Sequence, residues 1–356
     1  MRRHAVIPVL ALIFQLAVMG PSVPPAFAQG DANGGPICTA ANDQSGVKVV
    51  DDGAHGMYVL WSDARVTGHT GLYLQRIVPQ GYPAPGWPMN GIQISADVVN
   101  TARDFPPDIG YDMVRDPQNN KAIIVWPKYS NGSYDLFAQR VTPSGTFDWG
   151  SGGSAIVTGN SDQVAPSISL RTDGVLMVAF QSEGQGIYYQ EVDNNGTTVN
   201  MPNDGELVSE STHNTARFPV ITGSSQPVIA FKVPLGTNIY QGSYYAQKVG
   251  SQGSHIWTHD VLITNPDIGY GGSRDMSMVP DGQGGAFARP HLLLEHGEER
   301  QRPDGERSTR ALDVGSGGRG RGRTIRTGQH VIPPGCRTRR RRQVVADRSP
   351  RFKRAS

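Results

Sequence analysis

Cysteine is nearly absent from this sequence of 356 residues, which contains only Cys38 and Cys336. Small secreted domains held together by disulfides carry several paired cysteines, so this chain must rely on buried apolar surface instead. Charged residues are also sparse, at 18%. Neither a Gly-x-Ser-x-Gly nor a His-Glu-x-x-His motif occurs. The sequence therefore supports no catalytic nucleophile, no metal site and no cofactor.

Only one long apolar run is present, at Ala5–Met19. Basic residues precede it, and Ala26-Phe27-Ala28 follows it. Because the run is shorter than the ~20 residues that a membrane helix needs, it predicts a secretory signal over residues 1–28. Cleavage after Ala28 would leave no membrane span. We therefore expect a secreted protein, extracellular or at the cell surface, or in the periplasm.

The net charge of +2 conceals two oppositely charged parts. Residues 29–288 hold 13 Lys and Arg against 24 Asp and Glu, whereas residues 289–356 hold 18 against 7. Strand-like periodicity ends where the basic part begins. The segment 289–356 therefore reads as a basic, low-complexity tail without a fixed fold.

The stretch Lys121–Trp149 is repeated along the acidic part. It contains an apolar strand ending in an aromatic residue (Ala122–Trp126), a turn, a second strand (Leu136–Val141) and a later Trp149. Copies of the second strand place one glutamine in register at intervals of 64, 51 and 57 residues, at Gln75, Gln139, Gln190 and Gln247. A repeat of this length indicates a stacked array, because one such sheet cannot bury its own faces.

Each copy contains four strands, which is typical of a blade of a β-propeller. The predicted fold is all-β: an incomplete β-propeller of about four to five four-stranded antiparallel blades, with a disordered Arg-rich C-terminal tail. The blades are expected at residues 45–95, 108–157, 166–209 and 217–264, with a partial blade at 273–288, all within a repeat domain at 29–288. Gly35–Thr39 resembles the fourth strand of other copies, so it is expected to complete the last blade.

Two explanations compete for residues 289–356. The segment is either a basic arm that binds nucleic acid or a charged surface, or the product of a reading frame lost near residue 289. The repeat stops where an aromatic is due, and Pro290 stands there instead. Because repeat arrays end in capping structure, the lost frame is the favoured explanation. The β domain itself is not expected to bind nucleic acid.

Candidate binding residues lie in the predicted loops between the second and third strands of the blades. Loops at one face of a propeller converge and commonly carry function. Solvated turns are the competing interpretation, since polar residues are ordinary in loops. The tryptophans recur at two repeat positions and therefore predict core packing. The loop candidates are Asp63, Arg65, Lys128, Tyr129, Glu183 and Lys232.

A resemblance to known proteins rests on units that are followed by a Gly and a Trp, namely Trp61–Arg65 with Leu72–Arg76, and Asp135–Val141. The chain from Gly35 to Ala288 resembles tandem repeats of large secreted bacterial proteins of β-propeller type, a largely uncharacterised family. The resemblance implies an exported propeller and supplies no catalytic residues. Blades 3 and 4 depart from it, because Phe180 and Phe231 replace the Trp.

Two functions remain open. The first, which we favour here, is a non-enzymatic module that binds surface glycans or proteins or builds the cell surface. The alternative is a propeller hydrolase of the sialidase or glycosidase type acting on extracellular glycans, with Asp63, Glu183 and Asp135 as candidate carboxylates. Enzymes of that type bring two carboxylates within about 10 Å of each other.

Overall fold

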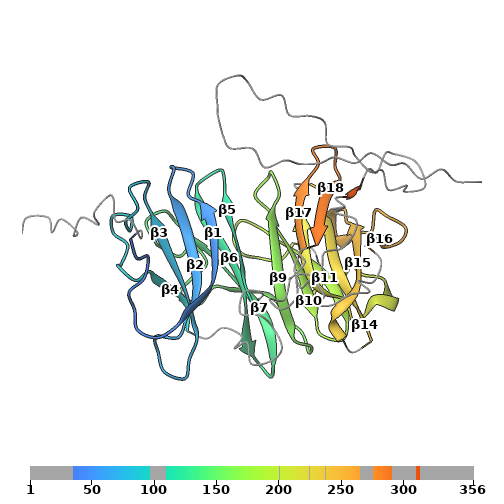
Figure 1. Cartoon of the computed structure of the whole chain (residues 1–356), viewed down its shortest axis with the longest axis horizontal. Helices are drawn as coiled ribbons and strands as arrows, with labels where there is room; N and C mark the ends of the chain where they lie inside the picture. The colour runs from blue at the N-terminus through green and yellow to red at the C-terminus, as the bar shows by residue number, and fades with distance from the viewer. Residues whose placement is uncertain are drawn as a thin grey trace, which may run out of the picture.

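The structure, a computed structural model, describes residues 35–96, 110–199, 201–223, 225–236, 238–264, 276–290 and 310–312. Within these ranges the chain forms five antiparallel sheets, four with four strands and one with three, and two short 3-10 turns. Figure 1 shows the sheets side by side, from the blue first sheet to the orange fifth. This confirms the prediction of an all-β propeller, and each sheet is called a blade below.

Each blade runs in chain order from one edge of its sheet to the other. Blade 1 comprises β1 (Gln44–Asp51), β2 (Met57–Asp63), β3 (Gly71–Ile77) and β4 (Ile92–Ser95); blade 2 comprises β5 (Asp112–Asp116), β6 (Lys121–Ser130), β7 (Ser133–Val141) and β8 (Ser154–Val157); blade 3 comprises β9 (Gln163–Leu170), β10 (Leu176–Ser182), β11 (Gly186–Val192) and β12 (Glu206–Leu207); blade 4 comprises β13 (Arg217–Thr222), β14 (Val228–Leu235), β15 (Asn238–Lys248) and β16 (Val261–Thr264); blade 5 comprises β17 (Met276–Pro280), β18 (Ala286–Pro290) and β19 (Arg310–Leu312).

Part of blade 5 falls in the segment predicted as a tail. Strand β18 continues through Arg289 and Pro290, and β19 pairs with it at Arg310–Leu312. Residues 291–309 and 313–356 lie outside the described part of the chain, as does the predicted signal at 1–28. The predictions for those segments stay predictions.

The first strands of neighbouring blades pack against one another, from β1 through β5, β9 and β13 to β17. Hydrogen bonds cross two of these joints. Asp112 Oδ2 on β5 accepts the N–H of Ile168 on β9 at 3.0 Å, and Ser167 Oγ on β9 accepts the N–H of Ile221 on β13 at 3.2 Å. The first strands are therefore the inner strands of the array.

The local sequence explains why β6 and β7 form a hairpin. The run Ala122–Trp126 in β6 is buried on both faces, as its β-branched and aromatic composition predicts. A two-residue turn at Asn131 and Gly132, with φ of 52° and 102°, then reverses the chain into β7. Both angles lie in the left-handed region that Asn and Gly tolerate, so the hairpin register is set by these two residues.

The core lies between blades, which is where the repeat predicts it. Trp61, Trp126, Trp87, Trp149 and Trp257 are all at most 8% exposed, which confirms that the tryptophans pack in the core. Trp87 Nε1 donates to Pro143 O and Trp149 Nε1 to Asn194 O, each in the following blade. Trp126 Nε1 has no acceptor among the described residues.

The repeated glutamines are buried and bond the chain just before the fourth strand. The Nε2 groups of Gln75, Gln139 and Gln190 donate to the carbonyls of Pro88, Gly150 and Pro202. The adjacent Arg76 bonds Asp52 in its own blade and Pro143 O in the next. The repeated Gln-Arg pair therefore ties strands within a blade and blades to one another.

Asp52, at the first turn of blade 1, makes folding sensitive to acid. Burial works to raise its pKa, but the N–H groups of Ala54 and Gly56 and the Arg76 guanidinium outweigh burial and hold the pKa below its usual value. A carboxyl with a lowered pKa adds stability above its unfolded pKa of about 3.9, and that stability is lost as the pH falls through the folded pKa.

We therefore expect the urea midpoint to fall as the pH is lowered below about 4, the usual pKa of Asp. The Asp52→Asn variant should show a shallower fall, because its side chain cannot titrate. Urea unfolding between pH 2.5 and 7 measures both. If the urea midpoint falls equally steeply with pH in the two proteins, Asp52 does not have this role.

Candidate active site

A polar pocket of about 410 Å³ opens at the end of blade 2 where β6 turns into β7. It is bounded by the turn between β6 and β7, by the segment that follows β8, and by one residue of blade 3. Thr158 N donates to Asn203 O at 2.9 Å, which fixes blade 3 against this wall. The lining residues are Asn131, Gly132, Ser133, Asp135, Thr158, Gly159, Asn160 and Asn203.

Asp135 on β7 is the one acidic residue in that lining, and it is 3% exposed. Its Oδ1 accepts the N–H of Gly159 at 3.3 Å. Burial raises the pKa of Asp135, while the Gly159 N–H and the Ser130 hydroxyl oppose the rise only in part. A carboxyl in this state is suited to carry a proton at a pH where an ordinary aspartate has lost it.

The rest of the wall is held by hydrogen bonds between loops. Ser133 Oγ donates to Gly159 O at 2.9 Å, and Tyr134 N donates to Asp162 Oδ1 at 3.0 Å. These contacts join the β6–β7 turn to the segment after β8. Hydrogen bonds therefore fix the loops that bound the pocket, and Asp135 itself lies on strand β7 of blade 2.

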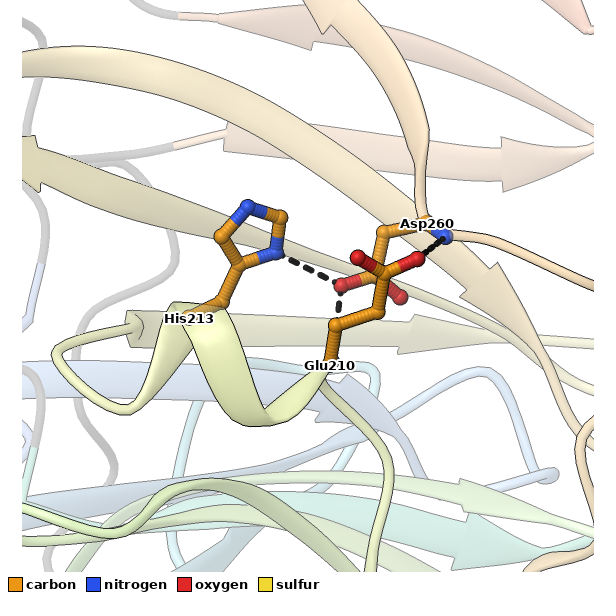
Figure 2. A group of neighbouring side chains, drawn as sticks. All are labelled: Glu210, His213 and Asp260. Carbon is orange, nitrogen blue, oxygen red and sulfur yellow. Dashed lines mark hydrogen bonds and ion pairs between the residues drawn. The ribbon is translucent and has the colours of Figure 1, made fainter.

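A second cluster joins blades 3 and 4, and Figure 2 shows its three side chains: Glu210 and His213 from the connector after β12, and Asp260 just before β16. His213 Nδ1 lies 2.7 Å from Asp260 Oδ2, and the Asp260 side chain is fully buried. Glu210 N donates to the same Oδ2 at 2.9 Å, and Asp260 N donates back to Glu210 Oε1 at 3.0 Å.

The Glu210–His213–Asp260 cluster offers three ligand atoms within 4.8 Å of one another, as a metal site would. These atoms are already engaged. Gln247 Nε2 donates to Asp260 Oδ1, His259 Nδ1 lies 3.1 Å from Glu210 Oε1, and the Asp260 N–H lowers the pKa of Glu210. A cation would have to displace these bonds, so the cluster is best described as a joint between blades.

Asp63 and Arg65, predicted as loop binding residues, lie in an internal network of blade 1. The Asp63 side chain is fully buried and accepts Trp61 Nε1 at 2.8 Å and Arg65 Nη2 at 2.6 Å. The Arg65 guanidinium stacks 3.7 Å above the Tyr73 ring. Burial works to raise the pKa of Asp63, but Arg65 and Trp61 lower it below its usual value. The contacts of both side chains therefore stabilise the end of β2.

The other predicted residues are scattered. Lys128 and Tyr129 lie on β6, with the Lys128 ammonium 4.8 Å from the Phe137 ring centre and Tyr129 63% exposed. Glu183 is exposed at the turn after β10. Lys232 corrects the loop prediction, because it lies within β14 and is 1% exposed. Strand β14 extends to Leu235, so Lys232 pairs in register with Arg217 and Tyr244 instead of entering a loop.

Of the carboxylates proposed for a hydrolase, the pocket contains Asp135 and neither Asp63 nor Glu183. Sequence reasoning missed the partners of Asp135, which come from the turn before β7, the segment after β8 and blade 3. Asn131-Gly132 carried a turn signal, but Asn160 and Asn203 carried none. The predicted loop between the second and third strands of blade 2 does line the pocket, through Asn131 and Gly132, but Thr158, Gly159 and Asn160 come from the segment after β8, which was not predicted.

The sequence matches no family model and no curated protein. Several solved structures resemble the chain. An arabinanase of Bacillus subtilis is 14% identical, with a TM-score of 0.40 over 73% of this chain and 93% of its own. An endo-arabinase of Bacteroides thetaiotaomicron is 11% identical (TM-score 0.41, 70% and 94%). A protein of unknown function from Dyadobacter fermentans is 9% identical (TM-score 0.46, 72% and 74%).

The prediction of a non-enzymatic module is wrong by these comparisons. Several of the similar structures are arabinanases, and a xylanase and an arabinofuranosidase also occur. The comparisons agree better with the alternative, a hydrolase. At TM-scores below 0.5 they assign no residue and no substrate to this chain. Within the described residues, no helix is long and apolar enough to cross a membrane.

Proposed function

We propose that the protein is a glycan hydrolase whose acid is Asp135. The observation that carries the proposal is a buried carboxyl with a raised pKa in the wall of an open polar pocket. The predicted signal at residues 1–28 and the resemblance to exported tandem-repeat proteins support an action of the protein outside the cytoplasm. The proposal names no sugar, because the pocket lining favours hydroxyl-rich ligands in general.

The lining supports a sugar as the ligand. Amides at Asn131, Asn160 and Asn203 and hydroxyls at Ser133 and Thr158 supply donors and acceptors. Sugars carry hydroxyl groups around the ring that donate and accept hydrogen bonds, and fixed polar side chains orient a ligand of this kind. A volume of about 410 Å³ lies in the range of small-ligand pockets. The pocket therefore fits one or two sugar rings.

Hydrolysis of a glycoside requires an acid and a second carboxylate. In the proposed reaction Asp135 gives its proton to the glycosidic oxygen as the bond to the anomeric carbon breaks. Water, losing a proton to the second carboxylate, then supplies the hydroxyl of the new reducing end. Asp204 is the candidate for that base, because it is exposed, follows Asn203 and has its Cβ within 3.5 Å of where a Cβ on Gly159 would lie.

The full-length protein should release reducing ends from at least one glycan in a panel that includes arabinan, xylan and sialylated and bacterial surface polysaccharides. The acid works only while protonated, so the rate should fall as the pH rises through the raised pKa of Asp135. Initial rates measured between pH 4 and 9 test this decrease of the rate with rising pH. The absence of release from the whole panel, at enzyme concentrations that would detect one turnover per hour, would overturn the proposal.

A further inference from the structure

We propose that Gln163 is a positioning residue of the Asp135 pocket: its buried amide fixes the segment after β8 so that the Gly159 N–H meets the Asp135 carboxyl. Gln163 lies outside the pocket lining and acts on the acid through Gly159. The inference rests on the proposed function, because it concerns the carboxyl that serves there as the acid. The geometry that carries it belongs to the chain alone, so one arm of its test needs no glycan.

Gly159 is the point of the pocket wall where contacts from blades 2 and 3 meet. Its N–H donates to Asp135 Oδ1 at 3.3 Å, and its carbonyl accepts Ser133 Oγ at 2.9 Å. Both partners lie on β7 of blade 2. The place of Gly159 therefore also depends on what supports it from blade 3.

Gln163, the first residue of β9 in blade 3, supplies that support. The residue is 1% exposed, and its Nε2 donates to Ser161 O at 2.6 Å, which ties down the connector between the two blades. A Cβ placed on Gly159 would lie 2.8 Å from the same Nε2 and 3.5 Å from the Cβ of Asp204. The Gln163 amide is therefore in contact with Gly159, beside the candidate base.

The contact bears directly on the acid. Burial raises the pKa of Asp135, and the Gly159 N–H is the first of the groups that oppose the rise. Because this N–H bonds the ionised carboxyl, a looser Gly159 should raise the pKa of Asp135 further. A change at Gln163 leaves the charged groups on the elements around the pocket as they are: Lys128 on β6, Asp162 before β9, Asp204 before β12 and Glu183 in the turn after β10.

The Gln163→Met variant tests the proposal, because methionine keeps the length of the side chain and lacks the N–H that bonds Ser161. We expect the pKa of Asp135 to rise by about 0.5 pH unit or more. The acid then stays protonated to higher pH, so the fall of glycan release with rising pH should shift upward equally. The 13C signal of the Asp135 carboxyl, in full-length protein with labelled aspartate, measures the pKa without substrate. Its loss in Asp135→Asn assigns that signal.

Gln181→Met is the matched control. Gln181 on β10 is also 1% exposed, and its Oε1, like that of Gln163, has no partner among the described residues. Gln181 pairs with Val164, whereas Gln163 pairs with Ser182. Since successive residues of a strand point to opposite faces of the sheet, Gln181 lies on the other face of blade 3. Its variant should leave the pKa of Asp135 unchanged.

Both variants should fold, because each loses a buried amide oxygen that has no partner, and circular dichroism checks this. If Gln163→Met does not fold, Gln163→Asn replaces it. Its amide is one methylene shorter, which opens the bond to Ser161 and should shift the pKa of Asp135 in the same direction.

An unchanged pKa of Asp135 in the Gln163 variant would overturn the proposal, and so would equal rises in the Gln163 and Gln181 variants. The two proposals can fail separately. If the pKa rises as expected while no glycan is cleaved, the hydrolase proposal fails and the role of Gln163 in placing Gly159 stands. If a glycan is cleaved while the pKa does not move, this inference alone is wrong.

Discussion

Replacing Asp135 with asparagine is expected to lower the kcat for glycan release by about 100-fold or more. Asparagine keeps the shape of the side chain and can still accept the Gly159 N–H, so the pocket should persist. It cannot deliver a proton to the glycosidic oxygen. Because binding groups are retained, KM should change far less than kcat. Steady-state kinetics on the best glycan of the panel measure both constants.

Asp173→Asn is the matched control, since it makes the same chemical change at a turn of blade 3 where the side chain is 58% exposed. Its rate should equal that of the parent protein. An Asp135→Glu variant should recover part of the lost rate, because it restores a carboxyl. Equal rates for Asp135→Asn and the parent would remove Asp135 from the reaction, whatever the substrate.

The second large effect concerns stability. Asp63→Ala is expected to lower the free energy of unfolding by about 3 kcal/mol. The fully buried carboxylate accepts Trp61 Nε1 at 2.8 Å, Arg65 N at 2.8 Å and Arg65 Nη2 at 2.6 Å. Its removal leaves the Arg65 guanidinium, whose side chain is only 20% exposed, without its anion. The Nε atom of Arg65 already lacks a partner in the described structure.

Urea unfolding at pH 7 measures the loss. Asp173→Ala removes an exposed ion pair with Arg171, and exposed pairs contribute about 0–1 kcal/mol, so it serves as the control. An Asp63→Asn variant should fall between the two, because its amide oxygen can still accept from Trp61. If Asp63→Ala and Asp173→Ala lose the same stability, the network around Asp63 does not support blade 1.

The architecture could be derived from the sequence because it is a local property repeated in register. Gln75, Gln139, Gln190 and Gln247 mark third strands, and each lies on one. The aromatic ends of second strands likewise recur. Four strands per repeat follow from such spacing without knowledge of any long-range contact, so the antiparallel blades were predictable.

The pocket could not be derived in the same way. Asp135 was identified as a carboxylate, but the burial that raises its pKa and the presence of Asn203 of the next blade in the same pocket are properties of the folded chain. Lys232 shows the same limit, since its burial follows from the length of β14 and not from its neighbours in sequence. Contacts between repeats depend on how sheets stack, and that stacking leaves no fixed spacing along the chain.

The unpaired indole of Trp126 has an optical consequence. Its Nε1 lacks an acceptor among the described residues and its ring is 1% exposed, because Lys128 stands where blade 1 has Asp63 to accept from Trp61. An indole in dry surroundings with no bonded N–H emits at shorter wavelength than one that is hydrated or paired. Trp126 should therefore contribute the bluest component of the intrinsic fluorescence and report, by its red shift, when blade 2 separates from blade 1.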